Sequence, residues 1–276
     1  MRDDSGRGGV PVDHETLEDL YTKLNRREFV HPDPLEFLYR YDEPGDREVV
    51  GLIASTLAYG RVKQILRSVE DALGRMGGSP AAFVRDSTSD SLRDAFAGFK
   101  HRFTTGDDLC RMLDGVRAVR RVHGSLGEFF AGLVNPEEET VVPALTAFVA
   151  AIEGAPCEAT GEEGVCPLPD PNRGSACKRL HLFLRWMVRH DAVDPGGWEG
   201  VPASKLVVPL DTHMHSLSLR MGLTERKQAD GRTALEVTKA FRAFSPDDPV
   251  KYDFSLTRLG IRDDMSADEL LLDRAA

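Results

Sequence analysis

A lysine and an aspartate at the starts of two predicted helices are the residues of this chain best suited to chemistry. Lys178 opens the amphipathic segment 178–189, and Asp211 stands just before a second helical pattern. An amine that has lost its proton, facing a fixed carboxylate, pairs a nucleophile with an acid/base partner. Each residue also has a structural interpretation: Lys178 as a surface lysine, and Asp211 as a helix N-cap. The two roles of Asp211 are compatible, because a capping carboxylate is held rigidly and stays ionised.

The segment that begins at Lys178 is basic on one side and apolar on the other. Its core stripe has the spacing of an amphipathic helix, with Leu180, Phe183, Leu184, Met187 and Val188. The formal net charge of −10 argues against nucleic acids as partners. Binding to phosphates depends on local patches, however, and residues 178–190 and 111–123 are both locally basic. Such runs are also typical of solvated helix faces.

Helical periodicity dominates the elements that must position this pair. Helices are expected at 13–27, 35–41, 46–59, 62–76, in several short pieces over 79–135, and at 143–152, 178–189, 212–221, 233–243 and 249–259. Residues 153–177 are rich in Gly, Pro, Cys and acids and are predicted to form a long loop. Strand-like alternation is missing from the sequence. We therefore expect an all-α fold: a flexible N-terminus at 1–12, then one two-lobed helical domain over 13–276 with a cleft between the lobes.

Composition narrows the class of protein further. No apolar run approaches the roughly 20 residues of a membrane helix, and residues 1–12 lack the apolar core of a secretory signal. Cys110, Cys157, Cys166 and Cys177 form no C-x-x-C pair, so a zinc ribbon is not expected. We interpret them as free thiols in a reducing cytoplasm. His213 and His215 are two residues apart and do not share a helix face, so no metal site is expected there.

Two segments resemble the helix-hairpin-helix DNA glycosylase superfamily. They are Gly174-Ser175-Ala176-Cys177-Lys178 and the run 210–220, which begins Leu-Asp-Thr-His. Those enzymes carry a Gly-x-Gly hairpin, a lysine that opens the next helix, and a Val-Asp-Thr-His-like element. The long interval between lysine and aspartate is similar to that of the archaeal 8-oxoguanine glycosylase branch. Ala176 departs from the pattern at the second glycine, and this matters only if the position needs a positive φ.

A second resemblance covers nearly the whole chain. It is to a bacterial family of unassigned function (DUF2400-like), marked by the string 178–189 and by the run 246–254. The glycosylase resemblance covers only about 170–222. A further segment, 52–60, resembles the endonuclease III-like helix that ends in a residue wedged into the base stack, which places Tyr59 at that position. The alternative for Tyr59 is a core tyrosine.

The glycosylase resemblance implies a DNA repair enzyme with AP lyase activity. Lys178 would attack C1′ of a damaged nucleotide, 8-oxoguanine first, and Asp211 would stabilise the developing charge. It implies contacts to duplex DNA from Gly174, Ser175, Ala176 and Tyr59. It also implies phosphate or structural contacts from Arg179, Arg185 and Arg189. The base pocket is expected to draw on Gln64, Phe183, Trp186 and Asp253. We expect the enzyme to need no cofactor. We also expect it to be a monomer in the cytoplasm, associated with the nucleoid.

Two other classes of function remain open from the sequence. One is a non-catalytic DNA-binding protein that keeps the hairpin scaffold. The other is a metal-dependent hydrolase that uses His190, Asp191, Asp211, His213 and His215. Tightly bound metal in the purified protein would favour the hydrolase, and DNA binding without base release would favour the binding protein.

Overall fold

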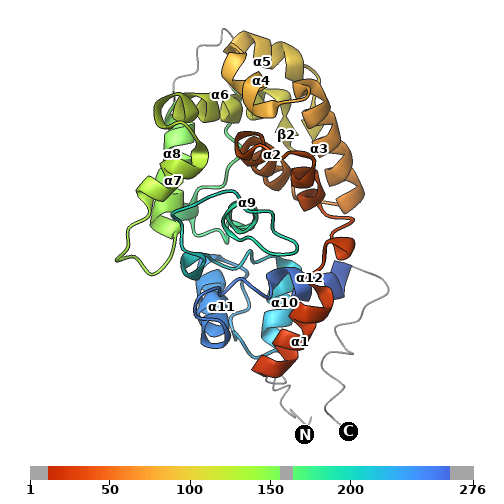
Figure 1. The fold of residues 1–276 in the computed structure, drawn as a ribbon, viewed down its shortest axis with the longest axis vertical. Helices are drawn as coiled ribbons and strands as arrows, with labels where there is room; N and C mark the ends of the chain where they lie inside the picture. The colour runs from red at the N-terminus through yellow and green to blue at the C-terminus, as the bar shows by residue number, and fades with distance from the viewer. Residues whose placement is uncertain (1–11, 156–163, 262–276) are drawn as a thin grey trace, which may run out of the picture.

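Helices build most of the protein in the computed structural model, which describes residues 12–155 and 164–261 (Figure 1). The α-helices are α1 (His14–Leu24), α2 (Pro44–Thr56), α3 (Val62–Met76), α4 (Pro80–Asp86), α5 (Ser89–Phe96), α6 (Gly106–His123), α7 (Leu126–Leu133), α8 (Val142–Gly154), α9 (Lys178–Val188), α10 (Thr212–Arg220), α11 (Gly231–Phe244) and α12 (Asp253–Ile261). Short 3₁₀ segments are η1 (Arg27–Phe29), η2 (Pro34–Arg40), η3 (Pro171–Arg173) and η4 (Ala203–Lys205). The predicted all-α fold is confirmed.

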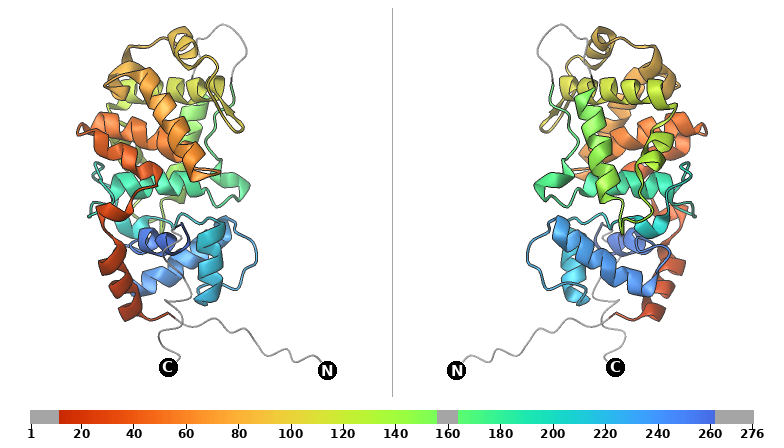
Figure 2. Two further views of the ribbon diagram at one scale, coloured as in Figure 1. Left: turned by 90° about the vertical axis from the view of Figure 1, so that its right-hand side faces the viewer. Right: turned by 90° about the vertical axis from the view of Figure 1, so that its left-hand side faces the viewer.

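The helices fall into two groups with α9 between them (Figures 1 and 2). One group contains α2 to α8, in which α2 packs on η2 and α6 packs on α5, α7 and α8. The other contains α1, α10, α11 and α12, in which α12 packs on both α1 and α10. Helix α9 packs against α2 and forms the middle of the molecule. This arrangement agrees with the two lobes expected from the sequence.

Helix starts follow the expected capping chemistry. Asp13 accepts a hydrogen bond from the Thr16 backbone N–H, and Asp211 caps α10 in the same way. Helix α3 has the predicted bounds, and it ends where Gly77 takes a φ of 74°. The predicted helix at 35–41 is the 3₁₀ segment η2, with Pro34 at its first position.

One small β-hairpin was not expected from the sequence. Strands β1 (Lys100–His101) and β2 (Thr104–Thr105) pair antiparallel, with Lys100 opposite Thr105 and His101 opposite Thr104. Strands of two residues are too short to give a detectable alternation. Arg102 and Phe103 form the tip, and Arg102 takes a φ of 53°.

Some predictions concern residues that the structure does not describe. Three of them lie outside the described residues. They are the predicted flexible N-terminus (of which only Val12 is described), Cys157 in the predicted loop, and the tail after Ile261. Among the described helices, none combines the length and the apolar character needed to cross a membrane.

Candidate active site

Lys178 and Asp211 meet in space, as the chemistry predicted from the sequence requires. The Lys178 Nζ lies 3.5 Å from Asp211 Oδ2. Their side chains are 30% and 32% exposed, so both remain reachable from solvent. The pair comes from different parts of the molecule, because α9 lies between the two helix groups and α10 belongs to the second.

Backbone geometry fixes both partners. Cys177 precedes α9 with a left-handed φ of 45°, which turns the chain so that Lys178 is the first helical residue. Asp211 Oδ1 accepts hydrogen bonds from the backbone N–H groups of His213 at 2.9 Å and Met214 at 2.8 Å. One carboxylate oxygen therefore caps α10, and the other oxygen faces the amine.

The pair lines a cavity of about 410 Å³ at the junction of the two helix groups. Helix α9 contributes Lys178, Leu182 and Arg185, which are spaced i, i+4 and i+7 and so share one helix face. Tyr59 and Gly60 border the cavity from the segment between α2 and α3. This volume falls within the range of small-molecule sites and suits one nucleobase with its sugar.

Asp253 supplies a buried carboxylate to the same cavity. It is 3% exposed, and it accepts a charge-assisted hydrogen bond from Arg185 through Oδ2. Its Oδ1 has no hydrogen-bond partner within the described residues. Burial raises the pKa of Asp253, the Arg185 guanidinium lowers it, and the charge of Asp211 raises it further. Of the residues predicted for the base pocket, Asp253 is the one that lines the cavity.

The predicted pocket roles of Phe183, Trp186 and Gln64 are not supported. Phe183 and Trp186 are fully buried at 0% exposure and pack in the core. Gln64 is exposed on α3 and does not line the cavity. The reason is helical geometry: Phe183 lies one position past the lining residue Leu182, about 100° around the helix.

Arg185 and Arg189 make structural contacts, which is one of the two roles that the sequence predicted for them. Both side chains are buried, and both pair with Asp194, which is 0% exposed. Arg185 also pairs with Asp253, and Arg189 with Asp248 at 2.8 Å. Buried charges of this kind need their partners, so these arginines join α9 to the chain around it, and Arg185 also lines the cavity.

Arg179 and Tyr59 form a fixed unit beside the cavity. Arg179 donates to the Thr56 carbonyl at 2.7 Å, and its guanidinium carbon lies 5.2 Å from the centre of the Tyr59 ring. The Tyr59 hydroxyl donates to the His101 carbonyl at 2.8 Å and accepts from the Thr104 N–H at 3.2 Å. Hydrogen bonds therefore hold Tyr59 on the wall of the cavity, where it is half-buried and not a core residue, and its contact with a base stack stays a prediction.

The exposed aromatic residue at this place is Phe103, which sequence analysis missed. Its side chain is 83% exposed at the tip of the β1–β2 hairpin. The Tyr59 hydroxyl anchors the hairpin by its hydrogen bond to the His101 carbonyl. The Arg102 side chain packs against Gly60 at the cavity edge. Tyr59, Phe103 and Arg179 line a second, more open hollow of about 490 Å³ on the other side of Tyr59. No local signal in the sequence marks Phe103, because its position follows from the fold.

The segment before Lys178 turns at Gly174. Gly174 takes a φ of 74°, whereas Ala176 is not among the described residues with positive φ, so alanine fits there without strain. Gly174 and Ser175 are exposed. The Gly231 N–H donates to the Gly174 carbonyl at 2.9 Å, which pins the hairpin to the start of α11.

The residues proposed for a metal-dependent hydrolase do not assemble into a metal site. Within residues 12–155 and 164–261, no group of three or more His, Cys, Asp or Glu side chains is placed to hold a metal ion. His190 is hydrogen bonded to the Pro195 carbonyl oxygen, and His215 to that of Arg226. Among the described residues, Cys110, Cys166 and Cys177 form no disulfide bond, and burial raises the pKa of Cys166 to about 11.

Fold and site together define an all-α protein with a lysine–carboxylate pair in a cavity between two helix groups. The chain belongs to the family described as "Protein of unknown function (DUF2400)", which matches residues 33–262. The match covers the described helices from α2 to α12 and includes Lys178, Asp211 and Asp253 of the cavity. No curated protein and no solved structure matches the chain.

Proposed function

We propose that this protein is a DNA glycosylase that removes a damaged base from duplex DNA through a lysine Schiff base. The observation that carries the proposal is the Lys178–Asp211 pair, 3.5 Å apart, on the wall of a cavity large enough for one nucleotide. An amine nucleophile next to a fixed carboxylate suits attack on a sugar carbon that develops positive charge. A DNA substrate would place the protein at the nucleoid.

In the proposed reaction the damaged nucleotide rotates out of the duplex into the cavity. The deprotonated Nζ of Lys178 donates its lone pair to C1′. The glycosidic C1′–N bond breaks, and its electron pair leaves with the base, which takes up a proton. The Asp211 carboxylate stabilises the positive charge that develops on the sugar.

The covalent intermediate then opens the sugar ring. Nζ gives up one proton, the C1′–O4′ bond breaks, and O4′ is protonated, which leaves a C1′=N Schiff base to Lys178. Removal of a C2′ proton would then expel the 3′ phosphate by β-elimination and nick the strand. Hydrolysis of the Schiff base would regenerate the amine.

Surface features around the cavity suit a duplex. The exposed hairpin residues Gly174 and Ser175 lie immediately before the nucleophile. Phe103 projects next to the cavity on an anchored tip, where an aromatic ring can stack on bases left by the extruded nucleotide. Lys100 and Arg102, both exposed, flank it with positive charge that favours phosphates.

The proposed lesion is an oxidised purine, with 8-oxoguanine first. Oxidation at C8 converts the N7 acceptor of guanine into an N–H donor. Asp253 lines the cavity, and a carboxylate oxygen of this residue can accept a hydrogen bond from such a donor. Guanine would present a lone pair to the same oxygen and be disfavoured.

The test is release of the modified base from a panel of duplexes that each carry one lesion. The wild-type protein should release 8-oxoguanine, and Lys178→Gln should abolish release while duplex binding remains. Lys239→Gln, an exposed lysine on α11, is the matched control and should behave as wild type. Duplex binding without release from any lesion would contradict the enzyme and support a non-catalytic DNA-binding protein instead.

A further inference from the structure

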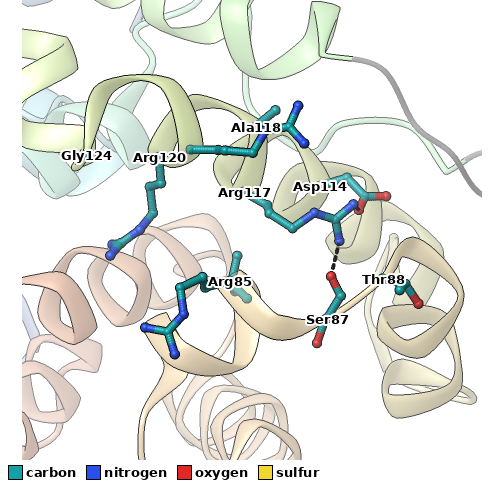
Figure 3. Close-up of a pocket in the computed structure, with 10 residues that line it drawn as sticks. Arg85, Ser87, Thr88, Asp114, Arg117, Ala118, Arg120 and Gly124 are labelled. Carbon is teal, nitrogen blue, oxygen red and sulfur yellow. Dashed lines mark hydrogen bonds and ion pairs between the residues drawn. The ribbon is translucent and has the colours of Figure 1, made fainter.

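A third hollow, of about 520 Å³, lies between α4 and the second half of α6. Figure 3 shows α6 on one side, with Arg117 and Arg120 reaching down from it, and Arg85, Ser87 and Thr88 on the opposite side. Four arginines line it in all, Arg121 being the fourth, against Asp114 as the one lining carboxylate. We propose that this hollow binds a small organic phosphate of about nucleotide size.

Two of the arginines are held in place by groups that are already there. Arg117 pairs with the buried Asp114 at 2.7 Å and donates to the Ser87 carbonyl at 2.7 Å (Figure 3). Arg120 donates through Nη1 to Glu48 at 2.7 Å and to the Gly45 carbonyl at 2.9 Å. Both side chains are less than 20% exposed, at 19% and 18%. Their guanidinium groups are therefore positioned in advance, which lowers the entropy lost when a ligand binds.

The other two arginines are free to turn toward a ligand. Arg121 is exposed, and within the described parts of the chain it has no hydrogen bond or ion pair. Arg85 is 70% exposed and, among the residues that the structure describes, pairs only with its neighbour Asp86, which is 66% exposed. Such an ion pair is weak in water. Arg117 and Arg121 are also four residues apart on α6, a spacing at which like charges repel. A bound anion removes that repulsion.

The lining chemistry fits a phosphate ester better than a bare anion. Guanidinium groups recognise phosphate through paired N–H donors, and the hydroxyls of Ser87 and Thr88 add further polar groups. Val84 and Ala118 give the hollow an apolar part that a base or sugar can cover. A volume of about 520 Å³ lies within the range of ligand sites.

This hollow is separate from the cavity that holds Lys178. Arg120 contacts Gly45 and Glu48 in the first turns of α2, whereas the cavity is lined by Ala58 and Tyr59, just past the end of the same helix. A helix of 13 residues spans roughly 20 Å. Helix α6 also separates the two sites, since its first residue follows the β-hairpin and its last turns carry the arginines of the hollow. The inference therefore does not rest on the proposed function.

The experiment is titration calorimetry of the full chain with adenosine monophosphate, pyrophosphate and inorganic phosphate. We expect saturable binding at one site per chain, tightest for the nucleotide. The double variant Arg85→Ala/Arg121→Ala should weaken that binding at least tenfold, because it removes two of the four guanidinium groups. Both side chains are exposed, so the variant is expected to fold. Arg67→Ala, an exposed arginine on α3 outside the hollow, should bind as wild type.

Two results would overturn the assignment. The first is equal, non-saturating heats in wild type and double variant, which would mean non-specific ion attraction. The second is a tenfold loss of duplex affinity in the double variant with no nucleotide binding in wild type, which would assign the arginines to the DNA backbone. Base release should be unchanged in the double variant, so failure here is distinguishable from failure of the glycosylase proposal.

Discussion

Asp211 divides its two carboxylate oxygens between structure and chemistry. Oδ1 accepts the His213 and Met214 N–H groups at the start of α10, and Oδ2 lies 3.5 Å from Lys178 Nζ. The start of α10 therefore fixes the Asp211 carboxylate, and its second oxygen faces the Lys178 amine in the cavity. Helix capping and the proposed catalytic role therefore use different oxygen atoms of Asp211.

Substitutions at Asp211 should separate these two functions. Asparagine caps helices as well as aspartate, so Asp211→Asn should change the free energy of unfolding by less than about 0.5 kcal/mol. Base release should slow by about 100-fold or more, since the charge facing the sugar is lost. Asp211→Ala should add a stability loss of about 1 kcal/mol from the missing cap. Urea unfolding and single-turnover kinetics measure the two effects, and unchanged turnover in Asp211→Asn would remove its catalytic role.

Phe103→Ala should weaken binding to a lesion-containing duplex without affecting folding. The ring is 83% exposed, so the unfolding free energy should stay within about 0.5 kcal/mol of wild type. Loss of base stacking should reduce affinity by about 1–3 kcal/mol, or roughly 5- to 150-fold. Val122→Ala, at a residue 71% exposed on α6, is the control for removing an exposed apolar side chain. Equal duplex affinity in both variants would exclude Phe103 from the interface.

Arg185→Ala should unfold more easily, and this distinguishes a structural arginine from a DNA contact. Removing Arg185 leaves Asp194 and Asp253 buried without their shared cation. We expect a loss of about 3–5 kcal/mol in the free energy of unfolding. Arg67→Ala, exposed on α3, should remain within about 0.5 kcal/mol of wild type. Wild-type stability in Arg185→Ala would contradict the buried ion network.

His181 should make the protein less stable in acid. Burial lowers the pKa of His181 from 6.5 to about 4, and its Nδ1 has no partner in the described residues. The unfolded chain therefore binds a proton that the folded chain does not. The resulting loss of stability begins as the pH falls below 6.5 and is complete below about 4. Its total is on the order of 3 kcal/mol.

The pH dependence of unfolding in His181→Leu measures that contribution. The variant should show a flatter stability profile between pH 6.5 and 4, and His190→Gln, an exposed histidine, should keep the wild-type slope. Identical slopes in His181→Leu and wild type would show that His181 accepts its proton without unfolding.

Sequence patterns predicted the helices because helices depend on local rules, whereas the meeting of Lys178 and Asp211 was expected from the motif resemblance. The apolar stripe of α9 and the N-cap at Asp211 are readable from neighbouring residues. The cavity face was also within reach, since Leu182 and Arg185 stand four and seven positions after Lys178. The base-pocket prediction failed for Phe183 and Trp186 because it relied on closeness along the chain and ignored that face.

Other features depend on partners that are distant in sequence. From the sequence alone, Arg185 is expected to be an exposed cation, because its partners Asp194 and Asp253 become neighbours only in the folded protein. Phe103 gains its position from a hairpin anchored on Tyr59, more than forty residues earlier in the chain. Tertiary contacts of this kind leave no periodic signal.

The most direct measurement is borohydride reduction of the protein mixed with a duplex that carries 8-oxoguanine, followed by mass mapping of the DNA-bound peptide. Attack by the amine predicts a covalent adduct on Lys178, lost in Lys178→Gln and retained in Lys239→Gln. An adduct on another residue, or one that survives Lys178→Gln, would contradict Lys178 as the nucleophile.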